Sequence, residues 1–592
     1  MRVGSGGTPA SVPVAAPGSE EAQMADAPLV VGINRTQDGS IAVTRGGPSM
    51  YSLQKERLSR RKHHWGRLGD LSRLYRGRVP YLDQPVDLVV EGYSSDAEIA
   101  NRDAYLAEIR DTLTLKPDAR VVLVSHHLTH LYSAFYPSPF EHAAGLVVDA
   151  QGSRMRDLTE PYAPPPGTPD DMLEVSSFYR CERGRVEVFA KQLWDGDWAR
   201  PAGLGCFYYL LTKMLWPDGE GNEGKVMGLA PFGDPDALGL PELEVSGHEV
   251  TIPTDWLKTF QERETYLYGQ APFGASAELA AAGQRAFENA LMKLVGWLHE
   301  QTGEDDLVFA GGCGLNCSAN GRLIRESPFR GVFIPPSPHD GGTAVGCALY
   351  GLVDVLGQTS DFRWTNDFLG PDQDDTAIAA AVATLGESYA VSQPEDLVGA
   401  MVDLLESGRV VAIHQGRSES GPRALGHRSI LADARHPGMQ DYINFEVKGR
   451  EWFRPLAPLV LADHAERVFD VDRPAPFMQY AAEVRPEFRA QLPAITHIDH
   501  TARLQTVEPV GTPFLHALLA AFHQRTGTPV LLNTSLNGPG DPLTESPEDS
   551  LKTLRETGMH ALVLGSYLIR KRDEPPLPPR ERDPRARATT RA

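Results

Sequence analysis

The chain has 592 residues, of which 41% are hydrophobic and 23% are charged. A chain of this length is expected to fold into more than one domain around buried cores. Its net charge of −21 argues against a general nucleic-acid or anionic-membrane binder, because phosphate contacts need clustered cations. Five cysteines are too few for a disulfide framework and favour a reducing, cytoplasmic compartment. No run approaches the ~20 apolar residues of a membrane-spanning helix.

The two ends of the chain are expected to lie outside the folded body. Residues 1–27 are rich in Gly, Ala, Pro and Ser, and residues 574–592 are rich in Pro and Arg. Segments of this composition bury too little apolar surface to fold, so both are predicted to be disordered. Met24 precedes the first apolar run, so Met1 and Met24 are both candidates for the natural start.

Between the ends, short β-branched runs alternate with helical segments. The first expected strands are residues 29–34, 86–90, 121–124, 146–148 and 307–310. A helix is expected over about residues 276–298, where apolar side chains recur at helical spacing. After a polar segment at 357–375, taken as a domain junction, the expected elements are a helix at 395–405 and strands at 410–414, 529–532 and 561–564. This alternation predicts an α/β fold whose sheets are covered by helices.

Two histidines and two carboxylates stand at positions that favour a metal site. His126 and His130 follow a predicted strand four residues apart, so they share one face of a helix with ~3.6 residues per turn. Asp149 ends another predicted strand, and ligands gather at the carboxyl ends of strands in open α/β folds. Asp340 lies in a glycine-rich loop. This mixed donor set suits Fe(II), Mn(II) or Zn(II), although histidine pairs at this spacing also occur by chance.

Three glycine-rich segments predict loops that expose backbone N–H groups to a phosphate. They are residues 223–233 with Lys225, residues 311–320 with Gly311, Gly312 and Asn316, and residues 339–343 with Gly341. No GxxxxGK[ST] motif is present, which excludes a Walker-type ATPase.

Cations concentrate between residues 415 and 454, where seven Lys and Arg accompany five Asp and Glu in an otherwise acidic chain. Arg suits bidentate recognition of phosphate, and Lys acts as a point charge. One alternative is a solvated basic surface, but the Gly and Pro around the arginines favour a shaped anion-binding loop. A polar turn that could hydrogen-bond a nucleotide follows the expected strand at 529–532. The candidate residues are Arg423, Arg428, Lys448, Arg454, Asn533 and Ser535.

Seven motifs follow one another along the chain: SHHLTHLYSAF, EGKVMGLAPFG, GGCGLNCSANG, SPHDGGTAVG, GRSESGPRALGHRSI, KGREWFRPLAP and PVLLNTSLN. Together they resemble the O-carbamoyltransferase family that includes nodulation protein U and the cephalosporin and tobramycin carbamoyltransferases. The resemblance covers residues 29–572. It implies that residues 28–365 form a carbamoyl-transfer domain with a duplicated ribonuclease-H-like fold of the actin, sugar-kinase and Hsp70 superfamily. Residues 366–573 would form a YrdC-like α/β domain that makes carbamoyl adenylate.

The resemblance also implies the chemistry. In such enzymes carbamoyl phosphate and ATP, with Mg, form carbamoyl adenylate, and an acceptor hydroxyl then takes the carbamoyl group. Carried over by position, the ligands of Fe(II), or of Zn or Mn, are His126, His130, Asp149 and Asp340. The residues that would hold carbamoyl phosphate, ATP and the adenylate are Arg423, Arg428, Lys448, Arg454, Asn533 and Ser535. The loops at Lys225, Gly311, Gly312, Asn316 and Gly341 would face a nucleotide in the first domain.

One position departs from the family's pattern. Many members carry a His-Asp pair after the first strand, whereas this chain has Gln37 and Asp38. Because a glutamine cannot take a proton at neutral pH, either His127, His339 or Asp38 acts as the base, or the metal alone activates the hydroxyl. This variation, with the segment at 54–66, looks closest to carbamoyltransferases that tailor polyketide antibiotics such as ansamycins.

Two other functions stay open from the sequence. One is a tRNA threonylcarbamoyl-type transferase, which would usually show an extended basic face. The other is a non-catalytic nucleotide-binding scaffold, against which the four candidate metal ligands weigh. We expect a hydroxylated small molecule as partner, with no nucleic acid and no membrane, and leave the oligomeric state open.

Overall fold

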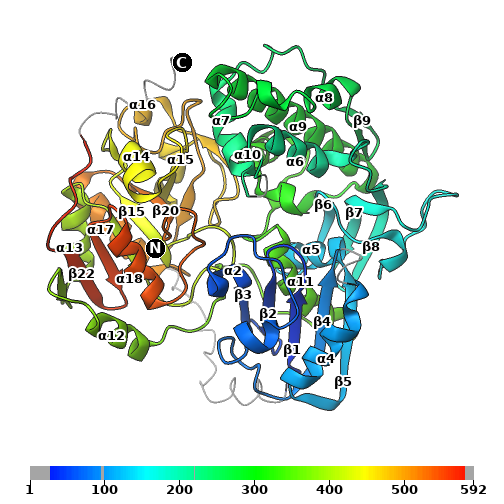
Figure 1. Ribbon diagram of the computed structural model, residues 1–592, viewed down its shortest axis with the longest axis horizontal. Helices are drawn as coiled ribbons and strands as arrows, with labels where there is room; N and C mark the ends of the chain where they lie inside the picture. The colour runs from blue at the N-terminus through cyan, green and yellow to red at the C-terminus, as the bar shows by residue number, and fades with distance from the viewer. Residues whose placement is uncertain (1–26, 95–98, 219–220, 580–592) are drawn as a thin grey trace, which may run out of the picture.

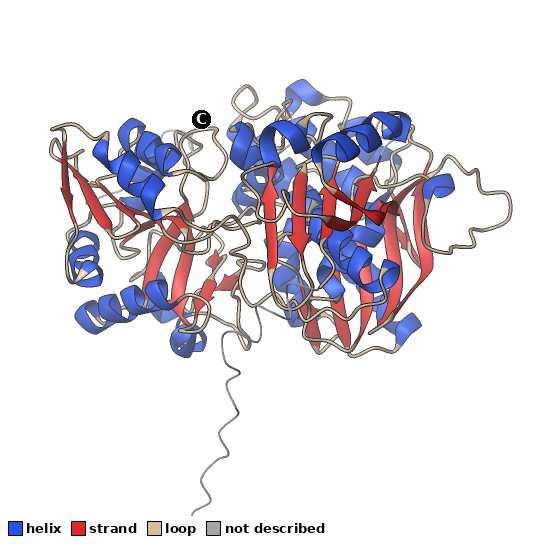
Figure 2. Cartoon of the chain, turned by 90° about the horizontal axis from the view of Figure 1, so that it is seen from below, coloured by secondary structure: helices blue, strands red, loops and turns tan. Residues whose placement is uncertain are grey.

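The computed structural model describes residues 27–94, 99–218 and 221–579. This part of the chain has the mixed α/β fold that the sequence predicted, with three main sheets. Figure 1 shows the sheet containing β1 at the lower right, the sheet containing β6 above it and the third sheet at the left; Figure 2 shows two masses of strands and helices side by side. The expectations for residues 1–26 and 580–592, including a start at Met24, fall outside the described residues.

The first sheet is built around a central apolar strand. Its strands are β1 (Val30–Asn34), β2 (Ser40–Thr44), β3 (Met50–Gln54), β4 (Val86–Tyr93) and β5 (Leu115–Ser125). The spatial order is β3-β2-β1-β4-β5, with β2 antiparallel to both neighbours and β4 and β5 parallel to β1. Every residue of β1 is buried, which explains why a continuous apolar run forms this strand.

The second sheet repeats this arrangement. Its strands are β6 (His142–Val148), β7 (Leu173–Glu182), β8 (Arg185–Trp194), β11 (Asp306–Ala310) and β12 (Gly331–Phe333). The spatial order is β8-β7-β6-β11-β12, with β7 antiparallel to both neighbours and β11 and β12 parallel to β6. The two sheets therefore share one strand order and one set of strand directions.

Two helices join the sheets. Helix α5 (His126–Phe135) packs on β6 and β11, and α11 (Thr343–Tyr350) packs on β1, β2 and β4, with the two helices in contact with each other. Their approach requires glycine, because a Cβ at Gly346 would lie 1.8 Å from the carbonyl oxygen of Thr129. The crossing brings the first residue of α5, His126, near the loop that precedes α11.

The third sheet has eight strands of mixed direction. In spatial order they are β13 (Tyr389–Ser392), β22 (Tyr567–Lys571), β21 (Ala561–Leu564), β14 (Val411–His414), β15 (Arg428–Ala432), β20 (Val530–Ser535), β16 (Ala457–Leu461) and β19 (Gln505–Val507). The helices of this region are α12 (Asp375–Ala383), α13 (Leu397–Glu406), α14 (Met439–Tyr442), α15 (Ala465–Val468), α16 (Pro486–Arg489), α17 (Pro513–Thr526) and α18 (Pro547–Glu556).

The remaining helices belong to the first two-thirds of the chain. They are α2 (Lys55–Ser59), α4 (Arg102–Thr112), α6 (Gly203–Leu215), α7 (Glu223–Leu229), α8 (Thr254–Thr259), α9 (Phe273–Thr302) and α10 (Cys317–Glu326). Two small two-stranded antiparallel sheets are formed by β9 (Glu244–Ser246) with β10 (Glu249–Thr251), and by β17 (Ala482–Glu483) with β18 (Thr501–Ala502). Among the described residues, no helix combines the length and apolar character needed to span a membrane.

The connection between the second and third sheets is an irregular but buried strap. Residues 357–374 form no helix or strand. Three of their aromatic side chains are nevertheless buried, namely Phe362, Trp364 and Phe368. The indole of Trp364 donates a 2.8 Å hydrogen bond to the carbonyl of Ser133 in α5, so the strap is anchored to the helix that carries the histidines.

Every strand and helix expected from the sequence is present, with ends that shift by a few residues. The glycine-rich loop expected at 223–233 is wrong, because this segment forms α7 followed by a 3-10 turn. The helix expected at 276–298, for example, is the longer α9. Strands such as β7 and β15 went unpredicted because polar residues interrupt their apolar pattern, although both are largely buried. At the far end, Glu574, placed in the tail by the sequence, forms a 2.6 Å ion pair with Arg409.

Candidate functional site

The four candidate metal ligands converge on one point. One ligand atom from each of His126, His130, Asp149 and Asp340 lies within 4.8 Å of the others. Nε2 of His130 is 3.2 Å from Oδ2 of Asp149 and 3.5 Å from Oδ1 of Asp340, and Nε2 of His126 is 3.4 Å from the same Asp340 oxygen. The two histidines on α5, the aspartate after β6 and the aspartate in the loop before α11 therefore come together as the sequence suggested.

Charge within the cluster favours a cation. Burial alone would lower the pKa of the imidazoles, but Asp340 and Asp149 raise the pKa of His126 to about 10 and raise that of His130 as well. Against the effect of burial, the two imidazoles hold the pKa values of both carboxyls below their usual range. A divalent ion would supply this positive charge while the imidazoles remain neutral, so the donor set fits a borderline ion such as Fe(II), Mn(II) or Zn(II).

Hydrogen bonds from outside the cluster orient its members. The Thr36 hydroxyl donates to Oδ2 of Asp340 at 2.8 Å, and the Gly312 N–H donates to Oδ2 of Asp149 at 3.2 Å. The N–H of His126 donates to the Ser153 hydroxyl at 2.9 Å. Ser125 occupies the N-cap position of α5 but makes no side-chain cap, since its hydroxyl bonds Glu160 instead. Sequence reasoning missed Thr36 and Ser153, because each acts through a partner distant in the chain.

Gln37 and the candidate bases lie beside this cluster without joining it. The Gln37 carbonyl accepts a 2.9 Å hydrogen bond from Asn34, and its side chain is half-buried. Burial lowers the pKa of His339, whose Nε2 is 3.7 Å from Oδ2 of Asp38. The other oxygen of Asp38 is 3.0 Å from Nδ1 of His63.

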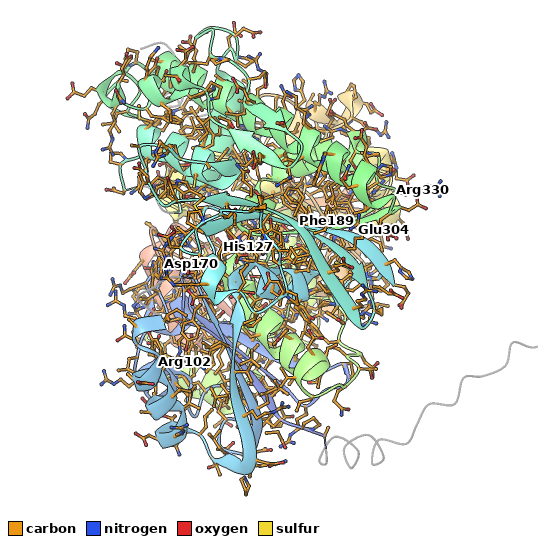
Figure 3. All side chains as sticks on the ribbon, turned by 90° about the vertical axis from the view of Figure 1, so that its right-hand side faces the viewer. Arg102, His127, Asp170, Phe189, Glu304 and Arg330 are labelled. Carbon is orange, nitrogen blue, oxygen red and sulfur yellow. The ribbon has the colours of Figure 1, made fainter. Side chains whose placement is uncertain are left out.

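His127 points into a different environment, a buried polar network behind α5. Its Nδ1 is 2.8 Å from the Ser177 hydroxyl, and its N–H donates to Glu174 at 3.0 Å. Lys191 lies at the centre of the network, 2.5 Å from Glu174 and 2.8 Å from Glu160. Burial and the Lys191 charge lower the pKa of His127 well below its usual range. Figure 3 shows His127 inside the molecule, near the cyan strands of the second sheet.

A large cationic cavity provides the second part of the site. It has a volume of about 840 Å³ and is lined by residues from 61–67 in the connection after α2, by residues of α7 and by residues of the third-sheet region. Among the residues that the structure describes, three acidic ones line it, namely Asp218, Glu451 and Asp499. Its Lys and Arg are Arg61, Lys62, Arg67, Lys225, Arg423, Lys448, Arg450, Arg454 and Arg503. Such an excess of cations is suited to a polyphosphate ligand.

Most of the residues predicted to bind an anion line this cavity. They are Lys225, Arg423, Lys448, Arg454, Asn533 and Ser535. Lys225 is 2.8 Å from Glu451, which joins α7 to the third-sheet region at the cavity wall. The Lys448 ammonium donates to the Asn537 side chain at 2.8 Å and to the Ser535 hydroxyl at 3.2 Å.

The other predicted binding residues do not line the cavity. Arg428 is buried, and its guanidinium donates hydrogen bonds to backbone carbonyls, including that of Gln415 at 2.8 Å. The glycine-rich loops at Gly311, Gly312 and Gly341 pack closely instead. For example, a Cβ at Gly311 would lie 2.2 Å from the carbonyl oxygen of Val148. Asn316 is buried and caps α10 by accepting from the Ala319 N–H at 3.1 Å. The expected contact of these residues with a nucleotide remains a prediction.

The cations of the cavity are held close together without enough counter-charge. Burial and the nearby Arg503 lower the pKa of Arg423 to about 9. Burial and neighbouring cations lower the pKa values of Lys448 and Arg450 well below their usual range. Within the described residues, Nε of Arg423, Nε of Arg503 and Oδ1 of Asn533 lack hydrogen-bond partners. Like charges held this close disfavour one another, so the cavity is suited to an anionic ligand that would add counter-charge.

Several cavity residues were missed by sequence reasoning. Lys62 and His63 lie in the segment at 54–66, whose sequence only suggested a subfamily. Arg450 lies within the basic stretch at 415–454 but was not named as a candidate binding residue. Arg503 stands alone in the sequence, so no local pattern marks it.

Comparison with known proteins agrees with the seven motifs. The family model described as Carbamoyltransferase N-terminus matches residues 101–349, and the model described as Carbamoyltransferase C-terminus matches residues 402–571. Nodulation protein NolNO of Sinorhizobium fredii is 32% identical over 571 residues, covering 91% of this chain and 80% of that protein. The 3'-hydroxymethylcephem-O-carbamoyltransferase of Streptomyces clavuligerus is 32% identical over 414 residues, covering 67% of this chain and 74% of that protein. The resemblance is thereby confirmed, and the chain belongs to the carbamoyltransferase family.

Proposed function

We propose that the chain is an ATP- and carbamoyl-phosphate-dependent O-carbamoyltransferase with two separate reaction centres. The observation that carries this proposal is the pairing, in a member of the carbamoyltransferase family, of a cationic cavity with a distinct His/Asp cluster. None of the four cluster residues is among the described residues that line the cavity. We assign activation of the carbamoyl group to the cavity and its transfer to the His/Asp cluster.

In the proposed first step, the cavity binds ATP, with Mg, and carbamoyl phosphate. Water hydrolyses the bond between the carbamoyl and phosphate groups, which releases inorganic phosphate and leaves carbamate; a carbamate oxygen then attacks the α-phosphorus of ATP and pyrophosphate leaves. Arg423, Lys448 and Arg454 would hold the phosphates, because cations stabilise the charge that gathers on the leaving groups. Asn533, whose Nδ2 donates to the Ala424 carbonyl at 2.9 Å, would line the binding site beside them. Ser535 would act with Lys448, to which it is hydrogen bonded.

In the proposed second step, the acceptor hydroxyl attacks the carbamoyl carbon, and AMP leaves. His126, His130, Asp149 and Asp340 would hold Fe(II), with Zn or Mn as alternatives, and this ion would supply Lewis-acid polarisation of the carbamoyl carbonyl. Thr36 orients Asp340 for this role. We keep Gln37 in the proposed site as a neutral group beside Asp38, and wild-type rates in Gln37→Ala would remove it from the chemistry.

The finer assignments of fold and partner belong to the same proposal. The repeated strand order of the first two sheets supports a duplicated ribonuclease-H-like unit over residues 28–365. Residues 366–573 would be the YrdC-like adenylate-forming domain. The acceptor is proposed to be a hydroxyl of a small secondary metabolite, such as an ansamycin-type polyketide intermediate, in the cytoplasm. The overall charge of −21 argues against a tRNA substrate.

The experiment that tests the proposal supplies purified protein with ATP, carbamoyl phosphate, Mg and Fe(II). Mass spectrometry should detect carbamoyl-AMP, and addition of hydroxylated acceptors should convert it into a carbamate ester and AMP. Reactions lacking carbamoyl phosphate or ATP serve as controls. Formation of a carbamate ester in the absence of ATP would contradict the proposal.

A further inference from the structure

We infer that His63, held by Asp38, is a charged phosphate-binding residue of the cavity. This inference rests on the proposed function and adds a nucleotide-phosphate contact on the side of the cavity that faces the His/Asp cluster. The adjacent sequence offers no motif for it, and its partner Asp38 is 25 residues away in the chain.

Two anchors fix the His63 ring and its backbone. Nδ1 of the ring is 3.0 Å from Oδ1 of Asp38, and the His63 N–H donates to the Glu56 carboxylate at 3.2 Å. Asp38 sits in a tight turn after β1 with a φ of 50°, a left-handed conformation that Asp and Asn tolerate better than most residues. Because Nδ1 is occupied by Asp38, Nε2 is the nitrogen left for a ligand.

The Nε2 edge of the ring, which receives no hydrogen bond from the described part of the chain, reaches the cavity. His63 lines the cavity, and its side chain is 34% exposed. Gly221, with a φ of +81°, lines the same wall, and a Cβ there would lie 2.4 Å from Nε2 of His63. Any larger residue at 221 would cover this nitrogen. The ring is therefore held at one edge by a carboxylate and presents its other edge at the cavity wall.

The charges around His63 favour the imidazolium form. Burial would lower its pKa, but Asp38, followed by Glu56 on α2 and Glu223 on α7, raises the pKa to about 9. Of the other groups nearby, burial lowers the pKa values of Lys62 and His339. An imidazolium whose Nδ1–H is given to a carboxylate donates its Nε2–H to an anion, which makes a strong, charge-assisted hydrogen bond.

The place of Asp38 indicates which side of the cavity His63 serves. Oδ2 of Asp38 is 3.7 Å from Nε2 of His339, the residue before the cluster member Asp340. His63 therefore lies on the wall that backs onto the cluster, whereas Arg423 and Lys448 come from the third-sheet region. The phosphate of AMP, the nucleotide product of transfer, is the anion that we propose the His63 imidazolium binds on this wall.

The test is calorimetric titration of the full-length protein with AMP at pH 7.5 and low salt. His63→Gln should weaken AMP binding by about tenfold or more, because a charge-assisted hydrogen bond is lost. Asp38→Asn keeps the left-handed turn but removes the carboxylate, so it should weaken binding at pH 7.5 and less at pH 6. His63→Lys, which restores a cation, should recover part of the affinity.

The matched control is His142→Gln, which removes an exposed ring at the start of β6, outside the cavity lining. Its AMP affinity should stay within about twofold of wild type. Equal AMP binding by wild type and His63→Gln would overturn this inference alone. Absence of AMP binding by the wild-type protein would overturn the proposed function together with it. Unchanged melting temperature and metal content of the variants separate loss of binding from loss of structure.

Discussion

The hydroxyl of Thr36 donates a 2.8 Å hydrogen bond to Oδ2 of Asp340, which lies 304 residues further along the chain. This bond turns the other oxygen, Oδ1, toward His126 and His130, at 3.4 and 3.5 Å. The turn after β1 thereby orients a carboxylate that the loop before α11 supplies.

Removal of this hydroxyl is expected to weaken metal binding. Thr36→Val should lower the affinity for Fe(II) or Zn(II) by about 10–100-fold, the usual effect of losing a partner that orients a metal ligand. Thr36→Ser keeps the hydroxyl and should retain most of the affinity. Competition with a chromophoric chelator measures both variants, and equal affinities for Val and Ser would show that the bond has no orienting role.

The buried Lys191 is expected to be essential for stability. Lys191→Met would leave Glu160 and Glu174 buried without their shared counter-charge, which should destabilise the fold by about 3–5 kcal/mol. Lys258→Met breaks the exposed pair with Asp255 and should cost less than about 1 kcal/mol. Urea unfolding compares the two, and similar losses would contradict the importance given to the buried network.

Alanine substitutions at two helical glycines, one at the crossing of α5 and α11 and one on α9, are expected to change stability in opposite directions. Gly346→Ala places a methyl group against the Thr129 carbonyl and should destabilise the protein by about 1–3 kcal/mol or more. Gly296→Ala, in α9 with open space around it, should stabilise by about 0.5–1 kcal/mol. Thermal unfolding measures both changes. A Gly346→Ala protein as stable as wild type would show that the helices can separate without cost.

Asp367 gives stability a pH dependence at the strap. Burial raises its pKa to about 7, with Glu419 adding to the shift and hydrogen bonds from Ser420 and Gly421 opposing it. Because the folded protein holds this proton more tightly than the unfolded chain, its contribution is complete below about pH 4 and is lost as the pH rises through about 7. Asp367→Asn cannot titrate, so the free energy of unfolding of the wild type minus that of the variant should fall over this range. A constant difference would contradict the shift.

The sequence was informative where function depends on local pattern. Continuous apolar runs predicted β1 and β14, and the spacing of His126 and His130 predicted a shared helix face that the structure bears out. The carboxylates were found because both follow recognisable signals, a strand end for Asp149 and a glycine-rich loop for Asp340.

The remaining residues depend on contacts that no local pattern encodes. Arg423 and Arg428 have similar surroundings in the sequence, yet one lines the cavity and the other braces backbone carbonyls. The backbone path of residues 415–427 decides which of the two arginines lines the cavity. Glu419 holds this path, because its carboxylate accepts hydrogen bonds from the Leu425 and His427 N–H groups. Arg503 and His63 likewise reach the cavity only through the folding of distant segments.

The division of the reaction between the cavity and the cluster is the central claim, and a comparison of His130→Ala with Arg423→Ala tests it most directly. Each variant is assayed for carbamoyl-AMP formation, carbamate-ester formation and bound metal. His130→Ala should lose ester formation and metal while still making carbamoyl-AMP at close to the wild-type rate. Arg423→Ala should lose carbamoyl-AMP formation with its metal content unchanged. Loss of both activities in His130→Ala, in a protein that remains folded, would contradict the two-centre account.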